Sequence, residues 1–169
     1  MYNFAAQLIG AVGIVLCLSC YQFNRRQRML AVKLLADIVW AVHFFMLGAY
    51  SGCSINILCG VRETVYLIDN DDRRQKLWIT VFMIAGWVSA AVTWNGMTSL
   101  MPTVAVTAAT YSFWQKSITV TRVIAFVVAV FMLIYDLFVG SYSGIVNETL
   151  TIISAVIALI RHKKVSCIK

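Results

Sequence analysis

The chain has 169 residues, of which 61% are hydrophobic and only 12% are charged. Soluble domains are closer to half apolar and about a quarter charged, so this composition excludes an ordinary soluble domain and predicts a membrane protein. The formal net charge of +7 indicates basic cytoplasmic loops rather than a nucleic-acid partner, because Lys and Arg mark the cytoplasmic side of such chains.

Seven apolar stretches follow one another along the chain. A helix of about 20 apolar residues crosses a bilayer core of roughly 30 Å. The first stretch has no basic start and no small-residue cleavage site, so we predict a membrane span there and not a signal peptide. The sequence therefore predicts an all-α membrane protein with seven transmembrane helices, at 4–23, 30–48, 52–68, 77–94, 99–115, 118–139 and 144–160.

The connections between these stretches alternate in charge. Most Lys and Arg residues lie in 24–29, 69–76, 115–117 and the tail 161–169, whereas 49–52, 95–99 and 141–144 contain none. The positive-inside rule then places the N-terminus outside and the C-terminus in the cytoplasm. We expect a multi-pass membrane protein with this orientation.

Two short segments, GAYSG at 48–52 and GSYSG at 140–144, are nearly identical and lie 92 positions apart. The same shift aligns Leu58 with Leu150. The match predicts two copies of a three-helix unit, 1–68 and 96–160, joined by a loop and linker helix at 69–95 and followed by a basic tail at 161–169. Three helices reverse the direction of the chain, so one linker helix gives both units the same orientation. Binding sites of such repeat proteins tend to lie between the units.

Three segments carry a resemblance to a known family. They are NRRQRMLAVKLLADIVWAVHFFMLGAYSG at 24–52, VRETVYL at 61–67 and NET at 147–149. With them the chain resembles the YgjV family of bacterial inner membrane proteins, and VHFFMLGAY, Arg62 and Glu148 are the most specific parts. The resemblance implies an inner membrane location and carries no catalytic residues. The 3+1+3 helix plan is more distantly similar to SWEET and PQ-loop transporters, although the chain lacks their Pro-Gln pair and most of their helix prolines.

Two charged residues are predicted near the middle of the membrane. Asp37 precedes Gly48 by 11 positions and Arg62 follows Gly52 by 10, which places both roughly 15 Å from the turn at 1.5 Å per residue. We expect an ion pair, which is either a fixed strut between two helices or a gate. Lys33 is expected to extend to the interface, and Glu63 to point away from Arg62.

A second group of polar residues is expected nearer the outer surface. Asp136 and Glu148 each lie four positions from the second turn and face one another in the predicted hairpin. They could hold a proton, a cation or polar groups of a substrate, or simply be solvated near the headgroups. With them we expect a polar funnel that opens outward and contains His43, Asn56 and Asn147. Trp40 could stack on a flat or sugar-like substrate.

Motifs of other function classes are missing from the sequence. Cys17 and Cys20 have no second cysteine pair to complete a tetrahedral metal site, and no Lys lies within 144–160 to hold a retinal. Phosphate-binding glycine loops, HExxH pairs and nucleophile elbows are absent. We therefore expect no enzyme activity, no cofactor and no metal.

These observations favour a carrier of a small polar solute that works by alternating access and is coupled to a proton or a cation. A non-transporting assembly partner of another membrane protein and a small membrane enzyme remain as alternatives. Three helices in each unit give few walls for a cavity, so dimerisation is compatible with the sequence and not readable from it.

Overall fold

A computed structural model describes residues 4–20, 26–69, 72–112 and 118–166, and these residues form seven helices without a strand. A short 3-10 turn, η1 (Met97–Ser99), precedes the fifth helix. The helices are α1 (Phe4–Cys20), α2 (Arg26–Met46), α3 (Tyr50–Ile68), α4 (Asp72–Val92), α5 (Leu100–Ser112), α6 (Ile118–Val139) and α7 (Tyr142–Ser166).

The predicted spans are confirmed as helices, with shifted ends. Helix α2 begins at Arg26 and not at residue 30, because the basic segment before the apolar stretch is also helical. Helix α7 runs to Ser166, so most of the predicted basic tail is part of the last helix. Residues 21–23 of the first predicted span and 113–115 of the fifth lie outside the described part of the chain.

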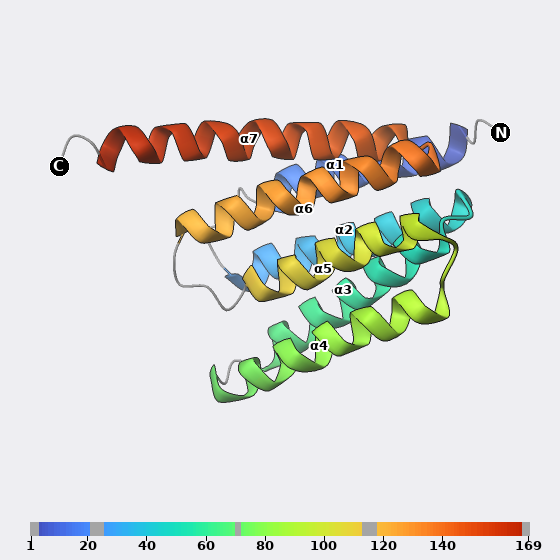
Figure 1. The fold of residues 1–169 in the computed structure, drawn as a ribbon, viewed down its shortest axis with the longest axis horizontal. Coiled ribbons are helices and arrows are strands. Elements are labelled where there is room, and N and C mark those ends of the chain that lie inside the picture. Colours follow the sequence, from blue (N-terminus) through green and yellow to red (C-terminus); the bar gives the residue numbers. More distant parts are fainter. Residues whose placement is uncertain (1–3, 21–25, 70–71, 113–117, 167–169) are drawn as a thin grey trace.

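The helices lie roughly alongside one another (Figure 1), and we call α1–α3 the first half and α5–α7 the second half. In the first half α2 packs against both α1 and α3, and in the second half α6 packs against both α5 and α7. The halves meet where α1 contacts α7 and where α3 contacts α5. Helix α4 packs against α3 and α5, and therefore lies beside the second junction.

The two similar turns have the same backbone conformation. Gly48 and Gly140 adopt φ angles of 71° and 73°, in the left-handed region that glycine tolerates best. Ala49 donates its N–H to the carbonyl of Phe44 at 2.9 Å, and Ser141 donates to that of Asp136 at 2.9 Å. These bonds close each helix with a left-handed C-cap of the Schellman type, so the turns match in structure as they do in sequence.

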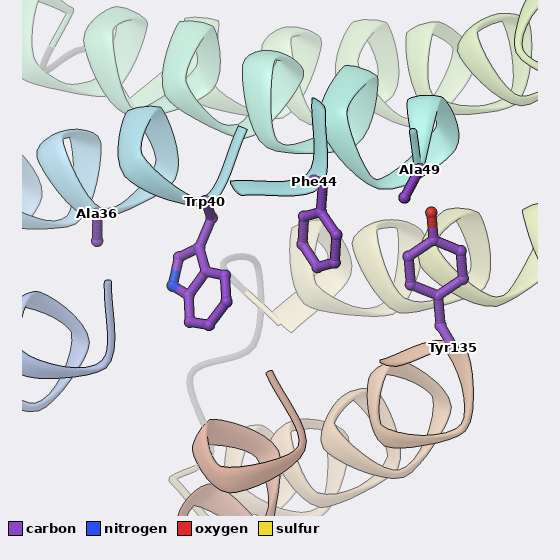
Figure 2. Packing of buried hydrophobic residues seen from close by; sticks show 5 residues of the cluster. All are labelled: Ala36, Trp40, Phe44, Ala49 and Tyr135. Atoms are coloured by element: carbon purple, nitrogen blue, oxygen red, sulfur yellow. The ribbon is translucent and has the colours of Figure 1, made fainter. Parts of the chain in front are cut away.

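A small apolar core lies between the two halves. Trp40 and Phe44 of α2 pack with Ala36, Ala49 and Tyr135, and all five side chains are at most 8% exposed. Figure 2 shows Trp40 and Phe44 extending from α2 into the space between the halves, while the hydroxyl of Tyr135 points toward Ala49 and the start of α3. This core places the polar groups described below around its edge.

The outer surface of the bundle is apolar. Phe4, Val92 and Phe138 are all more than 70% exposed, which suits a surface in contact with lipid. Among the described residues, the helix segment Gln27–Met46 is long and apolar enough by itself to cross a membrane. Shorter apolar segments lie in four other helices, at Phe4–Ser19, Lys76–Val92, Val123–Val139 and Tyr142–Ile157.

Candidate functional site

His43 joins three helices at the end of the bundle where α1 begins. Its ring is fully buried. Nδ1 lies 2.7 Å from the carbonyl oxygen of Ala6 in α1, and Nε2 lies 2.7 Å from Oγ of Ser141, just before α7. A carbonyl oxygen only accepts, so Nδ1 carries the ring proton and Nε2 of the neutral ring accepts the hydrogen of Ser141. His43 therefore ties α1 and α2 to the turn between α6 and α7.

Gln7 bonds the same turn from α1. Its Nε2 donates to the carbonyl of Gly140 at 3.0 Å, and its Oε1 accepts from the backbone N–H of Ser143 at 3.1 Å and from the Ser143 hydroxyl at 3.0 Å. The chain approaches closely here because Gly10 has no side chain: a Cβ at Gly10 would overlap Ser143 and would lie 2.9 Å from Nδ1 of His43.

The turn at 48–52 is bound by polar groups of the second half. The hydroxyl of Tyr135 in α6 accepts the backbone N–H of Gly52 at 2.8 Å. Ser51 donates its hydroxyl to Oγ of Ser99 at 2.9 Å. Ser99 is fully buried before α5, and its Oγ also accepts the backbone N–H of Asn95 at 2.9 Å.

These contacts are related by the shift of 92 positions. His43 corresponds to Tyr135, Gln7 to Ser99, and Ser51 to Ser143. In each half, a buried ring of the middle helix and a polar side chain in or just before the first helix bind the turn of the other half. We call this set the polar clasp, which consists of Gln7, His43, Ser51, Ser99, Tyr135, Ser141 and Ser143.

Asp136 and Glu148 lie beside the polar clasp. The carboxyl of Asp136 is 1% exposed and rests against Gly144, where a Cβ would occupy its space. Its Oδ1 makes no hydrogen bond with any described residue. Glu148 accepts a hydrogen bond from Nδ2 of Asn147 at 2.9 Å, and it is close enough to Asp136 for their charges to interact. The structure thus brings the expected carboxyl groups near one another.

The buried charges of the first half form a longer chain than the expected pair. Asp37 accepts from Nζ of Lys33 at 3.1 Å, Lys33 also lies 3.7 Å from Glu63, and Glu63 accepts from Arg62 at 3.0 Å. Arg62 further donates to the hydroxyl of Thr110 in α5 at 2.9 Å. Opposite charges therefore alternate over α2 and α3, and each offsets part of its neighbour's desolvation. The hydrogen bond to Thr110 joins this chain of charges to α5.

Two expectations about this chain of charges are wrong. Lys33 does not extend to the interface; it turns to Asp37 and Glu63 because two buried carboxylates are within its reach. Glu63 does not point away from Arg62, since the long guanidinium side chain folds back to its neighbour. The charge of Lys33 also interacts with that of Glu148, whereas no cation among the described residues acts on Asp136.

Asn56 and Trp40 are placed differently from the expected funnel. Asn56 donates to the carbonyl of Gly52 at 2.8 Å and lines an open apolar groove of about 560 Å³ between α2 and α3. Trp40 donates its indole N–H to Sγ of Cys17 at 3.4 Å and packs edge-on against His43. The expected funnel therefore does not include Asn56. Trp40 is a core residue, and its indole N–H is already bonded to Cys17.

Metal binding has no support in the described part of the chain. No group of three or more His, Cys, Asp or Glu side chains there is placed to hold a metal ion. The polar groups are instead distributed over the clasp, the two carboxyl groups and the charged chain. Such an arrangement suits proton exchange and hydrogen bonding to a polar molecule.

A comparison with known protein families assigns the chain. The model of the Imp-YgjV family, described as bacterial inner membrane protein, matches residues 4–166. The chain belongs to the Imp-YgjV family. It matches no curated protein and no solved structure.

Imp-YgjV proteins reside in the bacterial inner membrane, so the lipid bilayer covers the apolar outer surface of the helices. The segments by which the sequence resembles this family also contain site residues. His43 lies in VHFFMLGAY, Arg62 begins the link to α5, and Glu148 lies beside Asp136. The segments that resemble the Imp-YgjV family therefore contain several of the buried polar residues.

Several residues of the polar clasp were not predicted from the sequence. Gln7, Ser99, Ser141 and Ser143 are uncharged, so a search for ionisable groups in spans does not select them. The shift of 92 positions could have found three of them, because it aligns Gln7 with Ser99 and Ser51 with Ser143, but it aligns Ser141 with Ala49. A polar residue retained at equivalent positions of both units is the signal.

Proposed function

We propose that this protein is a carrier for a small polar solute, and not an enzyme, and that it works by alternating access between two three-helix units. The units are 1–68 and 96–160, with α4 as the linker in a 3+1+3 plan. The matched turns and the corresponding packing of α1–α3 and α5–α7 support the repeat. Parallel repeats with a site between them are a recurring transporter design.

The single observation that carries the proposal is the reciprocal polar clasp. Each unit binds the turn of the other through equivalent residues, so that the two units meet at one end of the bundle. The positive-inside rule places that end on the outer side of the membrane. In the proposed carrier, a closed clasp is a state closed to the outside, and opening requires the clasp to separate.

The groups behind the clasp would receive the solute or the coupling ion. Asp136, Asn147 and Glu148 supply carboxyl and amide groups near the junction of the units. Ionisable groups at such depth are costly in a membrane and are kept where they serve transport or pair with one another. Asp37 and Arg62, in the charged chain, would hold the first unit rigid against α5.

The test is the thermal stability of the purified protein against a panel of metabolites at two pH values. A solute that binds only the folded state raises the stability by mass action, by about 2.7 kcal/mol at 100 times its Kd. We expect one solute class to raise the melting temperature of the native protein and to have no effect on Glu148→Gln. Asp69→Asn, which changes an acid at the cytoplasmic end of α3 that pairs with Arg74, is the matched control and should respond as the native protein does.

Uptake of that solute into proteoliposomes then checks transport itself. Stabilisation without uptake would contradict the carrier. One observation favours the alternative of an assembly partner: the apolar groove between α2 and α3 is open to the membrane and could receive a helix of another protein. A single stable conformation that copurifies with another membrane protein would favour that function.

A further inference from the structure

We infer that the coupling ion of the proposed carrier is a proton, bound at Asp136, and that this proton locks the polar clasp through the single hydroxyl hydrogen of Ser141. This inference rests on the proposed function, and it adds the identity of the ion and the step by which the ion controls opening.

Ser141 makes two side-chain hydrogen bonds in the closed clasp. Its Oγ accepts the backbone N–H of Gly144 at 3.1 Å and lies 2.7 Å from Nε2 of His43. Because Nδ1 of His43 faces the carbonyl of Ala6, the neutral ring needs a hydrogen from Ser141 at Nε2. A serine hydroxyl has one hydrogen and two lone pairs. In the closed clasp, Ser141 has therefore used its hydrogen and retains one lone pair that can only accept.

Asp136 lies beside Ser141. Its carboxyl rests against Gly144, whose backbone N–H bonds Oγ of Ser141, and the Ser141 hydroxyl is the side-chain group that hydrogen-bonds this carboxyl. A carboxylate only accepts, so an ionised Asp136 would face an oxygen with no hydrogen to offer. A protonated carboxyl supplies the O–H that Ser141 can accept. The closed clasp is thus complementary to Asp136 in its neutral form.

The surroundings of Asp136 support the same form. Among the described groups that face it, Glu148 of α7 carries the same sign of charge, and Tyr135 and Ser141 are uncharged. Its Oδ1 is buried without a hydrogen bond among the described residues. A buried carboxylate without a neighbouring cation is costly, whereas the neutral acid is much less so.

Loss of the proton changes the bonds in a defined way. The Asp136 carboxylate becomes a charged acceptor that competes for the hydrogen of Ser141, and such bonds are about twice as strong as neutral ones. Nε2 of His43 then loses its donor, and the link from α1 and α2 to the α6–α7 turn is broken. Transfer of the same proton through Ser141 to His43 would keep every bond but separate two charges in an apolar interior.

The experiment measures the opening of the clasp by the distance between two spin labels. Tyr50 and Tyr142 are exposed, begin α3 and α7, and are equivalent under the shift of 92. Both are replaced by labelled Cys in a full-length chain whose five native cysteines are replaced by Ser, and the protein is reconstituted in lipid nanodiscs. Distances are recorded from pH 5 to pH 9. Since one proton is released, we expect the ratio of open to closed molecules to rise by up to about tenfold per pH unit within the titration range.

The decisive variant is Asp136→Asn. Its amide donates to Ser141 at every pH, so we expect one short distance throughout. Asp69→Asn, the same substitution outside the site, should keep the response of the parent chain, and Ser141→Ala should remove the pH dependence because the shared hydrogen is gone. Three results would overturn the inference. They are a pH-dependent distance that persists in Asp136→Asn, a distance in the parent chain that does not change with pH, and opening driven by Na⁺ at fixed pH.

The outcomes also separate this inference from the carrier. A pH-dependent distance that Asp136→Asn removes, in a protein that no solute stabilises and that transports none, would leave the proton lock in place and reject the carrier. Solute uptake by a protein whose label distances do not change with pH would support the carrier and reject the proton lock.

Discussion

At the scale of single residues, glycines decide where the two units can touch. Gly10 admits Ser143 and His43 to the surface of α1, and Gly144 admits the carboxyl of Asp136 to the surface of α7. Small residues allow close contact between helices in lipid, where packing replaces the hydrophobic drive. The hydrogen bonds of the polar clasp depend on these close approaches.

The first prediction follows for Gly10→Ala. The added methyl group would overlap Ser143 and crowd His43, so we expect a loss of about 1–3 kcal/mol through overpacking and a less tightly closed clasp. Thermal unfolding of the purified protein measures the loss. Gly60→Ala is the matched control, because its Cβ would lie 3.3 Å from the flexible end of Leu34; an equal loss in both variants would contradict the argument.

Residue spacing alone predicted the positions of some buried charged groups but not their partners. Counting from the turns correctly placed Asp136 near Glu148, because both lie one turn of helix from a tight connection. The same counting could not give the partners of Asp37 and Arg62. Depth along a helix follows from the sequence, but the long side chains of Lys33 and Arg62 choose among several carboxylates according to tertiary packing.

At the scale of helices, the matched turns carry equivalent bonds. Ser51 donates to Ser99 and Ser143 donates to Gln7, and each bond crosses from one unit to the other. The helix periods and loop charges predicted the helices themselves. The partners across the junction could not be predicted in the same way, because a serine at a turn has no property that distinguishes a bond across the junction from a local one.

The second prediction compares Ser51→Ala with Ser143→Ala. Each change removes one side-chain bond across the junction, and a typical bond of this kind contributes about 1 kcal/mol. Ser51 also lies 3.2 Å from the carbonyl oxygen of Thr93, but its single hydrogen is shared between that oxygen and Ser99, so this contact adds little. We expect similar losses for the two variants, and a double variant whose loss equals their sum within about 0.5 kcal/mol if the two ends of the clasp act independently. Ser19→Ala, whose hydroxyl bonds its own helix at Val15, is the control and should change stability little. A loss in one variant alone would show that the turns are not equivalent in strength.

At the scale of the whole molecule, the apolar surface and the charged loops define how the protein sits in the inner membrane. Exposed apolar side chains cover every long helix, and the described basic residues Lys76 and Arg74 lie near the start of α4. The end of the bundle with the polar clasp carries no Lys or Arg in its connections. Placement of that end outside remains a prediction from charge.

The third prediction tests this orientation with single cysteines. Met97→Cys lies at an exposed site in the connection before α5, and Lys76→Cys at an exposed site near the start of α4. In cysteine-free chains, we expect a membrane-impermeant maleimide to label Met97→Cys in intact spheroplasts and to label Lys76→Cys only after the membrane is disrupted. The opposite labelling pattern would invert the proposed topology and place the clasp in the cytoplasm.

The two turns differ in one residue, and that difference gives the molecule a direction. Ala49 packs in the apolar core, whereas its counterpart Ser141 holds the hydrogen that His43 requires. The proposed proton lock therefore belongs to the turn that carries Ser141, whereas the other turn is held by Tyr135 and Ser99. In the proposed carrier, the two junctions would thus respond to different signals.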